Sequence, residues 1–158
     1  GVRSAPNRGE SMRMPYLCLP LLLLLSSPAR AADLSVSCES PVGHRIERFT
    51  GKPTESSADG YRGVKPLFRL REGSTELLVS WGWSKGGAKV RDDEISVATV
   101  LDVSPTRIIA LEKNRSEYWL FALYPKLGIG LFTRHSEPLE GAANASVFSS
   151  ACSFSQAP

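Results

Sequence analysis

The clearest regularity in this chain is a two-residue alternation of apolar and polar side chains, and a helical period is nearly absent. In the segment 67–71, "LFRLR", Phe68 and Leu70 share one side. The segment 76–83 places four apolar residues on one side: Leu77, Val79, Trp81 and Trp83. Because successive strand residues point to opposite faces of a sheet, the two segments predict a hairpin with one apolar face.

The same alternation recurs along the chain, and in 94–104 it places Ile95, Val97, Leu101 and Val103 on one side. About eight strands are expected in all. Residues 51–66 and 84–93 are rich in turn formers and are interpreted as loops, and 136–145 as a link with a helical turn. We predict an all-β fold, either a small antiparallel barrel or a two-sheet sandwich, because both architectures hide apolar faces and limit exposed strand edges.

The segment 116–136 is apolar on both sides and carries five aromatic residues. A three-residue loop at 126–128, with Gly128 in a positive-φ position, predicts a hairpin that pairs Trp119 with His135. One face then carries Trp119, Phe121, Leu123, Leu131, Thr133 and His135, and the other carries Tyr118, Leu120, Ala122, Tyr124, Phe132 and Arg134. A strand with one face in water should not look like this. Either the fold covers both faces, or the outer face packs on a partner, or the inner face lines a ligand cavity.

Residues 12–31 have the parts of a secretory signal peptide: Arg13, then nine mostly apolar residues at 17–25, then the small residues Ala29 and Ala31. That run is much shorter than the roughly 18 residues of a membrane-spanning helix. We therefore expect cleavage near Ala31, no membrane span, and a secreted or periplasmic protein. Residues 1–11 are interpreted as a non-native or mistranslated upstream segment, and residues 32–158 as one domain.

The net charge of the predicted domain excludes one class of partner. The whole chain carries 19 basic and 16 acidic residues, but residues 1–31 hold four arginines and only Glu10. The domain from Ala32 onward therefore has 15 basic and 15 acidic residues. A net charge near zero, without a cluster of Lys and Arg, argues against binding to nucleic acid.

Two cysteines remain in the predicted domain, Cys38 near its start and Cys152 near its end. In an oxidising compartment such a pair predicts a disulfide between the first and last strands. This bridge mildly favours the barrel, in which those strands are neighbours. The wide spacing, with no adjacent histidine, argues against a metal site, and no cofactor is expected.

The sharpest catalytic motif is "GWSKG" at 82–86, which matches the G-x-S-x-G pattern of hydrolases around Ser84. Asp102 and His135 follow in the required order. However, the residues after Ser84 are poor helix formers, and the chain is too short and too rich in strands for that fold. A glycine-rich hairpin loop is the simpler interpretation, and the hydrolase is kept as an unfavoured alternative.

Two further patterns carry little functional information. The acidic run Asp92, Asp93 and Glu94 is interpreted as a solvated loop, because adjacent strand residues point apart and cannot converge on a metal. Asn114 and Asn144 begin N-x-S glycosylation signals, which have meaning only in a eukaryotic secretory pathway.

The sequence therefore predicts a non-enzymatic protein-binding or inhibitor-like module whose partner is an envelope or extracellular protein. The alternative is a carrier of a small apolar ligand in a barrel lumen. The candidate binding residues are Tyr118, Trp119, Phe121, Tyr124, Phe132, Arg134, His135, Trp81 and Trp83. For His135, a position at a strand end predicts backbone hydrogen bonding rather than a catalytic role.

Overall fold

The computed structural model describes residues 33–82, 95–138 and 140–156. All of them lie within one compact unit, Ala31–Pro158. The described residues form ten strands and no helix. The strands are β1 (Leu34–Cys38), β2 (Val42–Phe49), β3 (Glu55–Gly60), β4 (Leu67–Leu70), β5 (Glu76–Ser80), β6 (Ile95–Ser104), β7 (Arg107–Lys113), β8 (Glu117–Tyr124), β9 (Ile129–Ser136) and β10 (Ala142–Gln156).

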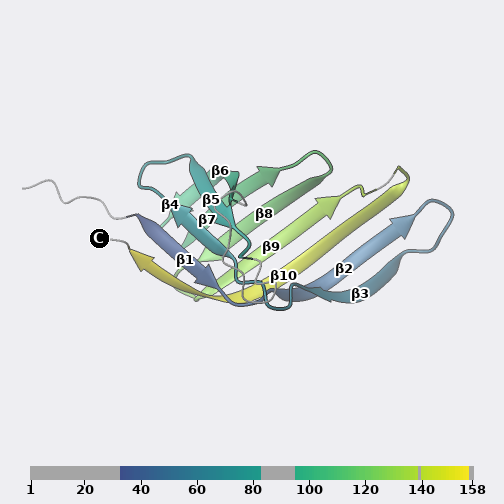
Figure 1. Cartoon of the computed structure of the whole chain (residues 1–158), viewed down its shortest axis with the longest axis horizontal. Helices are drawn as coiled ribbons and strands as arrows, with labels where there is room; N and C mark the ends of the chain where they lie inside the picture. The colour runs from purple at the N-terminus through teal and green to yellow at the C-terminus, as the bar shows by residue number, and fades with distance from the viewer. Residues whose placement is uncertain (1–32, 83–94, 139, 157–158) are drawn as a thin grey trace, which may run out of the picture. The chain divides into compact units, whose positions relative to one another are not determined.

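Eight of the described strands close into an antiparallel barrel, so the barrel rather than the sandwich is the fold. The order around it is β1-β4-β5-β6-β7-β8-β9-β10, and β10 pairs back with β1. Strand β10 is long enough to pair with two strands in succession. Its first half, residues 142–149, pairs with β2, and residues 152–156 pair with β1. The β2–β3 hairpin therefore extends the sheet beside the first half of β10 (Figure 1).

The predicted disulfide is present between the first and last strands. Cys38 ends β1 and stands directly opposite Cys152 of β10, and their sulfur atoms are bonded across 114 residues of sequence. Closing so long a loop restricts the unfolded chain and stabilises the fold by a few kcal/mol.

Aromatic rings fill the barrel interior. Phe68, Phe121 and Phe132 are fully buried and contact one another with ring centres 5.4–5.9 Å apart. Trp81 lies against Trp119 with 4.6 Å between the ring centres. Aliphatic residues from β1, β4, β5 and β7 complete this core. Small side chains, such as Ala98 and Ala110, take the inner positions where these rings need room.

The register of the β8–β9 hairpin differs by one residue from the prediction. Tyr124 pairs with Ile129 and Trp119 with Arg134, so His135 lies opposite Tyr118 instead of Trp119. The cause is the turn: both Leu127 N–H and Gly128 N–H donate to the carbonyl of Tyr124, which makes the connection four residues long. Gly128 has φ +65°, as expected. The shift moves Phe132 and Arg134 to the inner face and His135 to the outer face.

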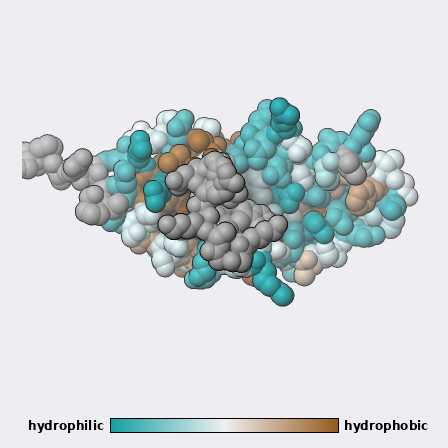
Figure 2. Space-filling view, in the orientation of Figure 1, coloured by the Kyte–Doolittle hydropathy of each residue, from teal (hydrophilic) through white to brown (hydrophobic). Residues whose placement is uncertain are grey.

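Two segments that the sequence assigned to connections contain strand. Residues 55–60 form β3 although they are mostly small and polar, because they pair with β2 and leave the other edge to solvent. Residues 142–145 belong to β10, so the helical turn expected at 136–145 is wrong. Hydrophilic side chains predominate over the region of β2 and β3 in Figure 2.

The apolar side of β6 faces outward, away from the core, which the sequence did not predict. Its four members share one side, as predicted, but each remains 46–58% exposed on the outside of the barrel. The opposite side of β6 carries the buried Ala98, because the aromatic rings already occupy the interior. Alternation therefore located the strand correctly but did not identify the face in contact with the core.

Candidate binding surface

Four neighbouring strands place an apolar row across the outside of the sheet. Ile46 of β2 pairs with Ala145 of β10, which pairs with His135 of β9, which pairs with Tyr118 of β8. Directly paired residues of antiparallel strands point to the same side, about 5 Å apart. The row is therefore continuous, and its two ends, Ile46 and Tyr118, are 54% and 45% exposed.

Two parallel rows extend the same side. The second runs His44, Val147, Thr133 and Leu120. The third runs Val42, Ser149, Leu131 and Ala122. Val42, Val147 and Leu131 are 64%, 58% and 38% exposed. We call the outward side of β8, β9, β10 and β2 the outer face. Contiguous exposed apolar side chains of this kind are typical of interaction sites.

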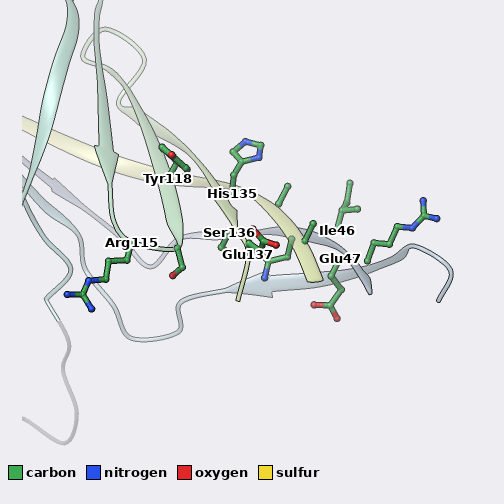
Figure 3. Close-up of a pocket in the computed structure, with 12 residues that line it drawn as sticks. Ile46, Glu47, Arg115, Tyr118, His135, Ser136 and Glu137 are labelled. Carbon is green, nitrogen blue, oxygen red and sulfur yellow. Dashed lines mark hydrogen bonds between the residues drawn. The ribbon is translucent and has the colours of Figure 1, made fainter. Parts of the chain in front are cut away.

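A groove of about 650 Å³ crosses the outer face near the ends of these strands. Ile46 and His135 rise from the same side of the sheet there, whereas Glu47 points to the other side (Figure 3). Tyr118 lies beside His135, and Arg115 lies beyond it, away from Ile46. The groove therefore combines apolar side chains, such as Ile46 and Tyr118, with charged ones, among them Arg48 and Arg115.

The inner side of the same strands is polar where it extends beyond the aromatic core. Arg134 Nε donates to Glu117 Oε2 at 2.8 Å, and Arg134 Nη1 donates to the Tyr61 hydroxyl at 3.2 Å. Trp119 Nε1 donates to the other oxygen of Glu117 at 3.1 Å. These bonds join Arg134, Glu117, Tyr61 and Trp119 into one group, which suits a structural role.

Burial raises the pKa of Tyr61, although the nearby Arg134 guanidinium opposes this effect. For Arg134, burial lowers the pKa, but Tyr61 and Glu117 outweigh burial and leave the pKa raised. The phenol therefore stays neutral and the guanidinium stays charged across the physiological pH range.

A buried carboxylate extends this network into β7. Glu112 is only 4% exposed and accepts hydrogen bonds from Ser96 Oγ at 2.8 Å and Asn114 Nδ2 at 3.2 Å. On the opposite edge, Ser146 Oγ donates to Asp59 Oδ2 at 3.1 Å, which connects β10 to β3. These bonds satisfy polar groups that would otherwise be costly to bury.

The structure divides the sequence-predicted site residues between the two sides of the sheet. Trp119, Phe121 and Phe132 are buried in the core, and Trp81 packs against it. Arg134 is half-buried in the inner network. The other predicted residues that the structure describes lie outside: Tyr118 and His135 are exposed, and Tyr124 is partly exposed. Trp83 lies outside the described residues.

Several outer-face residues were not predicted from the sequence: Val42, His44, Ile46, Arg48 and Val147. In residues 42–48, Val42 and Ile46 fall on the same side of a strand. They become part of a larger apolar surface only because β2 pairs with β10. That pairing joins segments about a hundred residues apart, and no local pattern reports it.

The described residues do not assemble the elements of a hydrolase triad. Asp102 pairs with Arg107 in an ion pair, and it lies on β6, which β7 and β8 separate from the β9 strand of His135. Ser84 and the acidic run 92–94 fall outside the described residues. Among those described, no cluster of three or more His, Cys, Asp or Glu side chains could hold a metal ion.

In the described part of the chain, no helix is long and apolar enough to cross a membrane. Asn114 and Asn144, which begin the glycosylation signals, both make side-chain hydrogen bonds within the fold, to Glu112 and Ser136. Comparison of the chain with protein-family models, with curated proteins and with solved structures finds no match.

Proposed function

We propose that this protein is an exported, non-enzymatic protein-binding module that docks its partner on the outer face. The observation that carries the proposal is the exposure of five apolar side chains on four adjoining strands: Val42, Ile46, Val147, Leu131 and Tyr118. Burying such side chains against a partner stabilises the complex by about 25 cal/mol for each Å² of apolar area removed from water. The groove beside Tyr118 gives this surface a shape that a complementary partner can enter.

The disulfide and the leader expected from the sequence both support a compartment outside the cytoplasm. The Cys38–Cys152 bridge fits an oxidising compartment outside the cytoplasm. Export through the signal peptide at 12–31 belongs to the proposal, since those residues lie outside the described part. An envelope or extracellular protein is therefore the partner that we favour.

The packing of the barrel weighs against the carrier of an apolar ligand. Trp81, Trp119 and Phe121 lie within ring-contact distance of one another inside it. An eight-stranded barrel leaves an interior that either side chains or one small ligand can fill, and here aromatic rings occupy it.

The test is affinity capture from the native envelope with three forms of the tagged domain: wild type, I46R/V147R and L127R. Leu127 is 68% exposed in the β8–β9 turn and lies off the outer face, so L127R is a matched control. We expect one reproducible protein that wild type and L127R retain and I46R/V147R loses. Equal retention by all three forms would contradict the proposal.

A further inference from the structure

The carboxylates of five neighbouring strands are confined to one side of the sheet. Strands β2, β7, β8, β9 and β10 contain three carboxylates, Glu47, Glu112 and Glu117. Each one points to the inner side. Glu112 is buried, Glu117 bonds Arg134 inside, and Glu47 lies 3.2 Å from the inward Arg45. The outward positions of these five described strands therefore hold no carboxylate.

Cations border the outer face instead. Arg48 points outward near the end of β2, and Arg115 lies in the β7–β8 turn. Both side chains line the groove. Lys113 at the end of β7 places its Nζ 5.7 Å from the centre of the exposed Tyr118 ring. Within the described part of the chain, none of these three cations lies within 4 Å of a carboxylate.

The rim of the groove balances this charge only in part. Two carboxylates line the groove. Glu137 follows β9 and donates its N–H to the carbonyl of Ser116, and Glu47 lies beside Arg45. The border of the apolar surface is thus net cationic.

The charge pattern separates three kinds of occupant. A second copy of this chain would bring Arg48, Lys113 and Arg115 against the same cations, which disfavours self-association. A wholly apolar partner would desolvate these cations without offering them a carboxylate. A partner that presents both aliphatic side chains and carboxylates can cover the apolar side chains of the outer face and pair with the cations at its border.

We infer that the partner docks through an acidic segment in which Asp or Glu residues flank aliphatic side chains. This inference rests on the proposed function and names the chemistry of the same surface. The aliphatic side chains enter the groove between Ile46 and Tyr118, and the carboxylates pair with Arg48 and Arg115. A groove of about 650 Å³ suits protruding side chains better than the flat surface of an anionic bilayer does.

The test selects ligands without assuming their sequence. A library of random peptides of about twelve residues, long enough to cross the four strands when extended, is selected against the wild-type domain. We expect selected peptides to be enriched in Asp and Glu next to aliphatic residues. Their affinity should fall at least about tenfold for R48E/R115E and weaken as the salt concentration rises through about 0.3 M.

The matched control is R71E/K126E, which reverses two exposed cations in the β4–β5 and β8–β9 turns with the same change of net charge. It should bind the selected peptides within about twofold of wild type. Enrichment of neutral or basic peptides, or equal binding by R48E/R115E and the control, would overturn the inference. So would salt-insensitive dimers in sedimentation, or binding to phosphatidylglycerol vesicles in place of peptides.

The variant I46R/V147R, which disrupts the apolar surface, separates failure of the acidic-segment inference from failure of the proposed docking surface. If I46R/V147R abolishes peptide binding while R48E/R115E leaves it unchanged, the outer face binds proteins and only the acidic chemistry is wrong. If I46R/V147R binds as wild type does, the outer face is not the docking surface, and both proposals fail.

Discussion

Arg134 lies directly opposite Trp119 in the β8–β9 pair, with its guanidinium carbon 5.7 Å from the centre of the indole ring. This pairing follows from the register that the four-residue turn sets, and that register decides which residues lie on each side of the sheet. It holds Arg134 among Glu117 and Tyr61 on the inner side and leaves Tyr118 and His135 outside. The binding surface exists in its present form because of this register.

The first prediction concerns the Arg134 network. R134M keeps much of the apolar stem but leaves the half-buried Glu117 carboxylate without its cation. We expect the free energy of unfolding to fall by about 1–2 kcal/mol, a range discounted because both side chains remain partly exposed. Urea denaturation measures the change. R115M, which removes a cation without a carboxylate neighbour, should leave the midpoint almost unaltered.

Removal of the disulfide tests the closure of the barrel. C38A/C152A should lower the free energy of unfolding by about 2–5 kcal/mol, because the unfolded chain regains the freedom that the bridge removes. Guanidinium denaturation of the variant and of the wild type, with and without reductant, gives the comparison. If reductant leaves the wild-type midpoint unchanged under conditions that free both thiols, the bridge does not stabilise the fold.

Gly43 tests the attachment of β2 to β10. A Cβ atom at this position would collide with the backbone carbonyl of Val147, which no side-chain movement can relieve. G43A should therefore separate β2 from β10, destabilise the domain by about 1–3 kcal/mol and reduce partner capture. Amide exchange along 42–49 measures the separation. S149A, on the exposed side of β10, is the control and should keep wild-type exchange.

Tyr61 yields a prediction for alkaline pH. Its pKa is raised in the folded state, so its contribution to stability is present below the unfolded pKa of about 10. That contribution is lost as the pH rises through the higher folded pKa. Phenolate absorbance at 295 nm should show one late transition that Y61F lacks. A single transition near pH 10 in both proteins would disagree with a buried phenol.

Much of the fold is visible in the sequence because it depends on local patterns. Alternation located the strands around Phe68, Leu77 and Phe121, and the cysteine spacing predicted which strands close the barrel. The strand at 55–60 escaped detection because an exposed edge strand needs no apolar side. Its existence depends on hydrogen bonds to β2, which no local pattern encodes.

The candidate site was less predictable for a related reason. Pattern alone could not set the register at 125–128, so Phe132 and Arg134 were placed on the wrong side relative to Trp119. The outer face also combines β2 with β9 and β10, which come together only through long-range pairing. The expectation of a two-sided apolar hairpin remained useful, because Tyr118 and Leu131 are exposed outside while Phe121 is buried inside.

The most direct measurement of the central claim is photo-cross-linking in the native envelope. A benzoylphenylalanine residue replaces Val147 at the centre of the outer face or, as a control, Leu127 in the β8–β9 turn. The account predicts a discrete cross-linked protein from position 147 and none from position 127. Absence of a product from position 147 in a folded, oxidised domain, or the same product from both positions, would contradict it.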